Sequence, residues 1–235
     1  NPIMVDNFTN GEMLFWGDPH THSSLSDGSG LPDEVFYYAR NVARLDFHAL
    51  TDHAELLAFV PAGITTVQNA ANKWYDPGEF VAYNGIEWTC VKEGHQTLIF
   101  SGNKNIDKPI SSYFNVKTTD GLWSLLDDFK TRTGQEIIAY PHHTTKNSYI
   151  QDWTYTNPAY VRMAEVSSTH GECLFEQRHP LNYRGGQDPP PTYQNGTSIM
   201  DALKMGYRMT LSAASDSHDG HPGHSIAHTG AYHGH

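Results

Sequence analysis

Short runs of apolar residues with β-like patterns are separated along the chain by longer runs in which apolar residues keep helical spacing. Within residues 32–45, for instance, Val35, Ala39 and Val42 recur every three to four positions, and Pro32 suits the first turn of a helix. Seven β-rich runs that alternate with helices favour an α/β fold built on a parallel sheet. The predicted strands are 13–16, 47–51, 80–86, 97–100, 136–140, 160–166 and 209–213, and the predicted helices are 32–45, part of 56–74, 119–132 and 198–206.

The pattern continues without an internal boundary, so we expect residues 1–235 to form a single domain. Residues 1–12 precede the first strand as a lead-in. Residues 180–195 are rich in Gly and Pro and predict a surface loop, and residues 221–235 predict a Gly- and His-rich loop or tail. No apolar run reaches the roughly 18 residues that a membrane span requires, so none is expected.

Composition adds a metal signal and removes some function classes. The chain has 26 Asp and Glu against 15 Lys and Arg, and its net charge of −11 disfavours a nucleic-acid-binding surface, because a phosphate backbone would be repelled. Histidine occurs 15 times, as often as Lys and Arg combined, and a neutral imidazole is a metal ligand or a proton carrier. Only Cys90 and Cys173 are present, which supports neither a zinc knuckle nor a disulfide scaffold.

His, Asp and Glu gather next to the ends of the predicted strands, where α/β barrels place their active sites. His20-Thr21-His22 follows the first strand, and in an extended chain both imidazoles of this pattern can reach one cation. Asp216-Ser217-His218 repeats the spacing after the last strand, with a carboxylate in place of one imidazole. The other candidates are Asp27, His53, Glu87, His95 and the adjacent pair His142 and His143, between which the sequence does not choose.

The size of this set indicates the number of ions. About six imidazoles and three carboxylates exceed the ligands of one tetrahedral zinc, so two or three divalent ions are expected. Mixed nitrogen and oxygen ligands suit Zn, Mn or Fe, and the residue types alone do not select among them.

The ordered set resembles the PHP family (polymerase and histidinol phosphatase domains), which are metal-dependent phosphoesterases on a distorted seven-stranded (β/α)7 TIM-like barrel. The resemblance runs from about Trp16 to His218 and is closest to an uncharacterised, often exported bacterial subgroup. It implies such a barrel and favours an exported or periplasmic location over a cytoplasmic one, while the oligomeric state stays open. The motifs that carry it are His20-Thr21-His22-Ser23-Ser24-Leu25-Ser26-Asp27-Gly28, Thr51-Asp52-His53, Glu87, Gly94-His95, Pro141-His142-His143 and Asp216-Ser217-His218.

Carried over by position, the resemblance implies up to three metal sites. Many family members have His where this chain has Asp27, and members with Asp there can hold fewer metals. Pro19 also departs from the family, in which an aliphatic residue is usual, and it removes a backbone donor beside the site. The implied sites are a first with His20, His22, Glu87 and Asp216, a second that shares Glu87 and adds His95 and His142, and a third with Asp27, His53 and His218.

The chemistry expected of such a centre is hydrolysis of a small phosphomonoester or phosphodiester. Two cations that share a carboxylate would hold a hydroxide that attacks phosphorus, with Asp216 as proton acceptor and His143 or His170 as the acid for the leaving alkoxide. Lys146 and Arg178 could bind the substrate phosphate, although each also fits a solvated surface charge. Two other interpretations stay open: an amidohydrolase-type hydrolase of C–N or carboxylic ester bonds, and a non-catalytic metal-binding scaffold.

Overall fold

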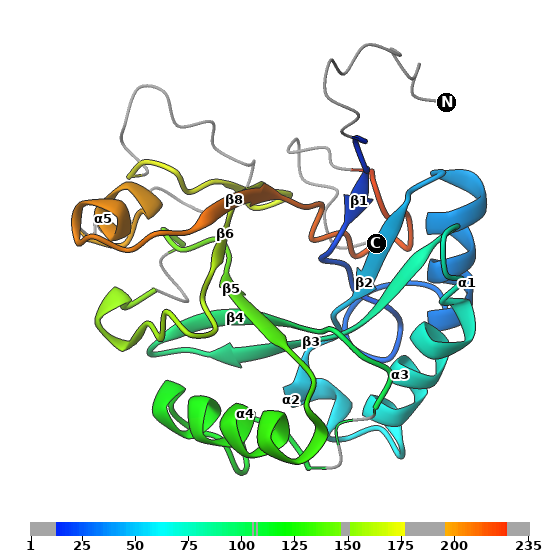
Figure 1. Ribbon diagram of the computed structural model, residues 1–235, viewed down its shortest axis with the longest axis horizontal. Helices are drawn as coiled ribbons and strands as arrows, with labels where there is room; N and C mark the ends of the chain where they lie inside the picture. Colours follow the sequence, from blue (N-terminus) through cyan, green and yellow to red (C-terminus); the bar gives the residue numbers. More distant parts are fainter. Residues whose placement is uncertain (1–12, 105, 107, 147–150, 177–195, 225–235) are drawn as a thin grey trace.

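Strands and helices alternate along the chain in a mixed α/β fold (Figure 1). The computed structural model describes residues 13–104, 106, 108–146, 151–176 and 196–224. Its strands are β1 (Gly17–Asp18), β2 (Phe47–Leu50), β3 (Val81–Cys90), β4 (Gly94–Phe100), β5 (Ile137–Pro141), β6 (Met163–Ser168), β7 (Gly171–Glu172) and β8 (Thr210–Ala213). Its helices are α1 (Pro32–Tyr37), continued by a π-helix (Tyr38–Val42), α2 (Ala54–Leu57), α3 (Gly63–Trp74), α4 (Thr119–Thr133), a 3-10 helix (Trp153–Tyr155) and α5 (Ile199–Lys204).

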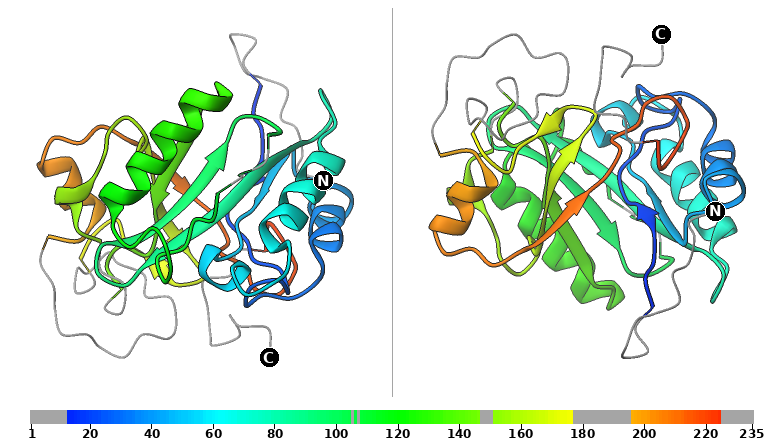
Figure 2. Two further views of the ribbon diagram at one scale, coloured as in Figure 1. Left: turned by 90° about the horizontal axis from the view of Figure 1, so that it is seen from below. Right: turned by 90° about the horizontal axis from the view of Figure 1, so that it is seen from above.

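The strands form two sheets that curl around a common centre, with the helices on the outside (Figures 1 and 2). The larger sheet has the order β1-β2-β3-β4-β5, and the smaller has the order β7-β6-β8. Isolated parallel bridges join the two sheets at both seams. Ala139 in β5 pairs with Val161 just before β6, and Thr21 beyond β1 pairs with Ser217 beyond β8.

The predicted parallel sheet is correct for three of the six strand pairs and wrong for those that involve β4 or β7. β1, β2 and β3 pair in parallel, as do β6 and β8, but β4 runs antiparallel to both β3 and β5. The reason is a tight hairpin: only residues 91–93 lie between β3 and β4, and Gly94 has a φ of +92°, which suits such a turn. A parallel crossover needs a dozen or more residues, which this connection does not have.

The bounds of several predicted strands shift in the structure. Glu87 lies inside β3, and His95 is the second residue of β4, because both strands are longer than the predicted 80–86 and 97–100. The first strand starts after the predicted 13–16, whose side chains are exposed. The sixth predicted strand starts later, as β6, and pairs with the short β7, which the sequence did not predict.

The helices pack apolar faces against the sheets. In α4, Leu122, Leu126 and Phe129 follow helical spacing and are buried, and each such side chain contributes about 1.5–3 kcal/mol. Thr118 caps the helix by accepting a backbone N–H hydrogen bond of 3.2 Å, and Gly134 ends it in the left-handed conformation, as predicted.

Three predicted helical regions are shorter or divided. The helix predicted over 32–45 ends at Val42, and the one predicted over 198–206 is shortened to α5. The region 56–74 is divided between α2, which ends at Leu57, and α3, which starts at Gly63 after Ala62 takes a left-handed φ of 55°. None of the helices within the described ranges has the length and apolar character that crossing a bilayer requires.

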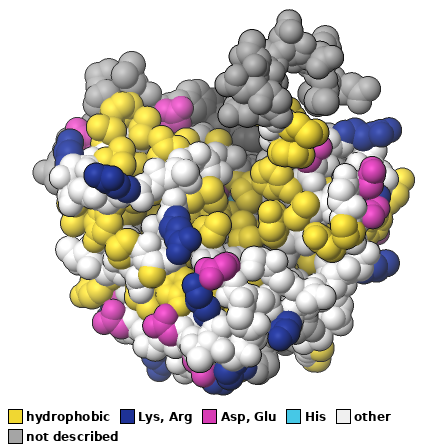
Figure 3. All heavy atoms as spheres, viewed as in Figure 1, with side chains coloured by type: hydrophobic (Ala, Val, Ile, Leu, Met, Phe, Trp, Pro, Cys, Tyr) yellow, Lys and Arg dark blue, Asp and Glu magenta, His cyan; other side chains and the backbone are white. Residues whose placement is uncertain are grey.

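The end of the sheets at which the parallel strands begin is apolar. A hollow of about 410 Å³ there is lined by Trp16, Phe47, Tyr83, Ile138 and Met163 among others. Figure 3 shows hydrophobic side chains gathered across the middle of this face. The candidate ligands lie at the opposite end, so the two ends of the fold differ in chemistry.

Several predictions fall on residues that the structure does not describe. These are the lead-in 1–12, the loop 180–195, residues 225–235 of the predicted tail, and Arg178 as a phosphate-binding candidate.

Candidate metal centre

The loops that follow the parallel strands bring candidate ligands to one end of the curled sheets. His20 and His22 follow β1, His53 follows β2, and Asp216 and His218 follow β8. Because the carboxyl ends of parallel strands meet at one edge, these side chains converge although they are far apart in sequence.

Four donor atoms form one compact group. The Nε2 atoms of His20 and His22 each lie 3.2 Å from Oε2 of Glu87, and they lie 3.5 and 3.2 Å from Oδ1 of Asp216. All four side chains are at most 2% exposed. Tetrahedral ligands about 2.1 Å from a divalent ion lie about 3.4 Å from one another, so the separations fit such an ion.

The other carboxylate oxygen of Glu87 faces a second set of imidazoles. Its Oε1 lies 2.6 Å from Nδ1 of His95, 3.3 Å from Nε2 of His142 and 3.3 Å from Nδ1 of His53. Glu87 therefore lies between two groups of nitrogen donors with one oxygen toward each. His142 approaches Glu87, and the ring of His143 lies beside that of His95 at 4.6 Å. Ligand atoms of His95, His142 and His143 also lie close enough together to hold one ion, so both members of the adjacent pair are candidate ligands.

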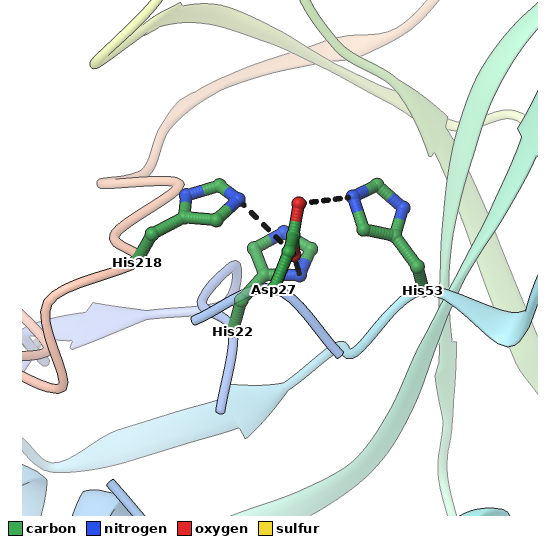
Figure 4. A group of neighbouring side chains, drawn as sticks. All are labelled: His22, Asp27, His53 and His218. Carbon is green, nitrogen blue, oxygen red and sulfur yellow. Dashed lines mark ion pairs between the residues drawn. The ribbon is translucent and has the colours of Figure 1, made fainter. Parts of the chain in front are cut away.

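Asp27 lies in a third group with His22, His53 and His218 (Figure 4). Its oxygens lie 3.5 Å from Nε2 of His53, 3.4 Å from Nε2 of His218 and 3.7 Å from Nδ1 of His22. The side chain of Asp27 is 39% exposed, so this group opens toward solvent more than the first. His22, which the predicted third site lacks, faces this group with Nδ1 and the first group with Nε2.

Several side chains of the site come from the β3–β4 hairpin, in which every second residue points to the same face. Glu87 pairs with Thr97, and Thr89 pairs with His95, across the antiparallel ladder. Residues that lie opposite each other, or two positions apart, share one face of a sheet, so all four side chains face the candidate centre. The hairpin that the sequence did not predict is thus what places Glu87 and His95 together.

Hydrogen bonds to the second ring nitrogens orient the candidate imidazoles. Oε2 of Glu165 lies 3.0 Å from Nδ1 of His20, and Nδ1–H of His218 donates to the backbone carbonyl of Asp216 at 2.9 Å. Where Nδ1 carries the proton, Nε2 of the neutral ring has a lone pair and acts as an acceptor. That lone pair repels a nearby carboxylate oxygen unless a cation or a proton lies between the two atoms. The threonine hydroxyls of the hairpin contact two further rings, Thr89 at 2.7 Å from Nδ1 of His53 and Thr97 at 3.2 Å from Nδ1 of His142.

Sequence reasoning missed Glu165. It lies in β6, 145 residues from His20 in sequence, and only 1% of its side chain is exposed. Burial raises its pKa to about 7. An acidic residue inside an apolar strand pattern is costly unless it is paired, and that was the signal that could have found it.

Asp52 holds the loop that carries the carboxylate of the third group. It accepts hydrogen bonds from the backbone N–H of Ser23 and from the hydroxyls of Ser23 and Ser26, at 2.7, 2.7 and 2.5 Å. Gly28 allows the loop to close, because a Cβ there would lie 2.3 Å from the carbonyl oxygen of His22. The Ser26-Asp27-Gly28 motif therefore shapes this loop, in addition to supplying the candidate ligand Asp27.

Two residues of the site have left-handed backbone. Asp216 has a φ of 50° and His143 a φ of 35°, which costs a non-glycine residue about 1–3 kcal/mol. The surrounding structure holds Asp216 in this conformation, since its N–H donates to the carbonyl of His20 at 2.9 Å. Strain of this kind is concentrated at functional sites.

The pKa values of His20 and His22 are raised by the neighbouring carboxylates. Burial alone would lower the pKa of His22, but hydrogen bonds and charge from Asp216 and Glu87 raise it to about 10. The pKa of His20 is raised well above its usual value in the same way, against burial, by Asp216 and Glu165. Protons on these rings neutralise the carboxylates, and metal ions at the same place would displace them.

Asp216 links the centre to His170 and Lys146. Its Oδ2 lies 3.1 Å from Nε2 of His170, and Nζ of Lys146 lies 3.1 Å from Nδ1 of the same ring. Because an ammonium group only donates, Nδ1 of His170 accepts and Nε2–H donates to Asp216. Burial lowers the pKa of His170, which agrees with a neutral ring. This geometry makes His170 an orienting partner of Asp216.

His143 is the other predicted acid. Burial, together with the neighbouring rings of His142 and His95, lowers its pKa well below the usual value. A neutral imidazole at pH 7 has no second proton to give to a leaving group, so its electrostatics argue against the acid role.

A cleft of about 220 Å³ opens above these groups. His20 and His22 lie fully buried beneath it. The structure thus brings together all of the predicted site residues that it describes. Those that line the cleft are Asp27, His53, Glu87, His95, His142, His143, Lys146, His170, Asp216 and His218.

Comparisons with known proteins find a family that matches part of the sequence and solved structures that are similar to this one. The family described as a protein of unknown function (DUF3604) matches residues 62–152, which is less than half of the chain. The comparison with curated proteins found no match.

Among solved structures, PsfC from Pseudomonas syringae is similar, with a TM-score of 0.51 and 15% identity over 87% of this chain and 76% of PsfC. A two-domain protein from Bacteroides vulgatus that contains a predicted PHP-like metal-dependent phosphoesterase gives a TM-score of 0.49 and 19% identity, over 88% of this chain and 52% of that one. A lesion-specific endonuclease from Pyrococcus furiosus gives a TM-score of 0.46 and 14% identity, over 89% of this chain and 50% of the endonuclease. The likeness to PsfC shows a shared fold.

Proposed function

We propose that the chain is a metal-dependent hydrolase of phosphate esters on a PHP-like seven-stranded barrel, with β1 to β6 and β8 as its ring. One observation supports this most: the two carboxylate oxygens of Glu87 face two different imidazole sets, His20 with His22 and His95 with His142. A carboxylate between two such sets is suited to bridge two cations. The ordered resemblance to the PHP family supports phosphate esters as the substrate class.

In this proposal the three donor groups hold two or three divalent ions, with Zn, Mn or Fe as candidates. Ions bound there supply a nucleophile at neutral pH and positive charge for the phosphoryl oxygens. The residues that hold them are His20, His22, Glu87 and Asp216 for the first, Glu87, His95 and His142 for the second, and Asp27, His53 and His218 for the third.

The remaining steps are performed by side chains around the cleft. Burial would raise the pKa of Asp216, but His20 and His170 outweigh it and hold the carboxyl ionised, so Asp216 can accept a proton. His170 keeps the carboxylate in its orientation through the 3.1 Å contact with Oδ2. Lys146 lines the cleft as a cation that can bind a phosphate oxygen.

The test is a substrate panel on protein loaded in turn with Zn, Mn and Fe. We expect turnover of para-nitrophenyl phosphate or its diester, and no turnover of an anilide or a lactone. A duplex oligonucleotide is tested as a further substrate, and we expect no cleavage of it because the net charge of −11 repels a phosphate backbone.

Glu87→Gln should abolish turnover and reduce the bound metal, because the amide cannot bridge two cations. Glu79→Gln, which removes the same charge at an exposed position, should leave both unchanged. Hydrolysis of the anilide or lactone without any phosphate ester would overturn the proposal in favour of an amidohydrolase-type enzyme. Less than one ion per chain with no hydrolysis would favour a scaffold.

A further inference from the structure

An exposed tyrosine forms part of the wall of the cleft. Tyr113 lines the cleft together with the candidate ligands, and 52% of its surface is exposed. Its ring lies 6.5 Å from that of Phe114, which in turn lies 5.3 Å from that of Phe59. Phe114 and Phe59 are also more than half exposed. Phe114 lines a neighbouring apolar hollow of about 420 Å³ rather than this cleft. The exposed rings therefore lead from Tyr113 in the cleft to an adjoining apolar surface, where apolar groups can bind.

A buried carboxylate holds the loop that carries Tyr113. Glu55 in α2 is 1% exposed, and its two oxygens accept the backbone N–H groups of Ser112 at 2.7 Å and Thr89 at 3.1 Å. The hydroxyl of Ser112 also donates to the carbonyl of Thr89. Because Thr89 lies two positions from Glu87 in β3, one carboxylate ties this loop to the strand that carries the central candidate ligand.

Other contacts hold the same loop in place. The Trp88 indole N–H in β3 donates to the carbonyl of Val116 at 2.9 Å, and within the loop the N–H of Tyr113 donates to the hydroxyl of Ser111 at 3.3 Å. A buried carboxylate is costly unless it is fully hydrogen-bonded, and here its hydrogen bonds serve to position an exposed loop. The position of Tyr113 relative to Glu87 is therefore fixed by the fold.

The charges around the cleft limit what else the substrate can carry. Among the described residues that line it, Lys146 is the one lysine or arginine, and the proposed function already assigns it to the substrate phosphate. Glu55, which is not a candidate ligand, adds a carboxyl group next to the loop of Tyr113. A second phosphate or a carboxylate on the leaving group would therefore find no further lysine or arginine there to pair with. An apolar leaving group would meet Tyr113 and Leu56 instead.

We propose that Tyr113 is the binding platform for a flat apolar leaving group, so that the substrates are phosphate esters of aromatic alcohols. This inference rests on the proposed function and adds the substrate class to it. Aromatic rings in offset or edge contact attract each other beyond the area that they bury, which favours an aryl group over an alkyl group of the same charge.

The experiment compares phenyl phosphate with ethyl phosphate in wild type and in Tyr113→Ala and Tyr113→Phe. Each variant is compared with wild type on the same substrate, so the intrinsic reactivity of the two esters cancels. Tyr113→Ala should lower kcat/KM about tenfold for phenyl phosphate, mainly through KM, and less than twofold for ethyl phosphate. Tyr113→Phe should retain wild-type values. Tyr75→Ala, a half-exposed tyrosine away from the cleft, is the matched control.

A second readout does not require turnover. Calorimetric binding of phenylphosphonate to the metal-loaded protein should weaken about tenfold in Tyr113→Ala, while binding of methylphosphonate should not change. Equal losses for both esters and both phosphonates would overturn this inference and leave the proposed function intact. Absence of hydrolysis by wild type of both esters and also of the para-nitrophenyl diester would overturn the proposed function and this inference with it.

Discussion

Replacement of Glu165 by alanine should weaken metal binding without touching any candidate ligand. The carboxylate lies 3.0 Å from Nδ1 of His20, and both side chains are at most 1% exposed. Removal of Glu165 leaves Nδ1–H of His20 without its acceptor, so the ring is free to rotate or to change tautomer. Nε2 of His20, which lies 3.2 Å from Glu87, then loses its orientation toward the candidate centre.

The magnitude follows from the burial of this pair. A hydrogen bond to a charged buried group contributes about 1.5–3 kcal/mol. Loss of an outer partner of a metal-bound imidazole weakens metal binding about 10–100-fold, which corresponds to about 1.4–2.8 kcal/mol. The two ranges agree, so we expect Glu165→Ala to raise the Kd for zinc by one to two orders of magnitude. Glu165→Gln keeps an acceptor but loses the charge, and an intermediate effect is expected.

The assay is competition for zinc with a chromophoric chelator at pH 7.5, with far-UV circular dichroism to show that each variant is folded. Glu79→Ala serves as the control for removal of an exposed carboxylate. An unchanged Kd in folded Glu165→Ala would refute the argument that this carboxylate orients His20. An equal loss in both Glu165 variants would show that charge, rather than the hydrogen bond, is what matters.

The remaining predictions concern catalysis, substrate binding and pH. Asp216→Ala or His20→Ala should abolish turnover and lower the metal content with the fold retained, and wild-type activity in either would contradict the assignment. Lys146→Ala should raise KM for a phosphate ester about tenfold or more and change kcat less, as steady-state kinetics would show. Burial holds the pKa of His48 at about 4, below its usual value, so the unfolded chain takes up this proton first as the pH falls. The contribution of neutral His48 to the free energy of unfolding is therefore fully present above pH 6.5, and about 3 kcal/mol of it is lost as the pH falls toward 4. In urea unfolding measurements, the His48→Gln variant should lack this part of the pH dependence.

The candidate centre could be predicted largely because its signals are local. His20 and His22 are two positions apart beside a strand end, as are Asp216 and His218, and such spacing is visible without knowing the fold. Their convergence then follows from parallel strands, which meet at one edge. Helix α4 was predictable for the same reason, since its apolar spacing and its terminating Gly134 are both local.

The parts that the sequence did not predict depend on contacts between distant residues. Glu165 stands out in the sequence as an acidic residue within a strand pattern, but nothing local identifies its partner His20, which is 145 positions away. The direction of β4 is a partial exception, because residues 91–93 followed by Gly94 are a hairpin signal between two β-rich runs. The chain of contacts from Lys146 through His170 to Asp216 also crosses three loops, and no spacing in the sequence indicates it.

The central claim is that Glu87 lies between two metal ions. Anomalous difference maps from crystals of metal-loaded protein, collected at the zinc, manganese and iron edges, test this most directly. We expect two peaks at the carboxylate, one on the side of His20 and His22 and the other on the side of His95 and His142, whether or not a third peak lies at Asp27. A single peak at Glu87, or none, would contradict the claim.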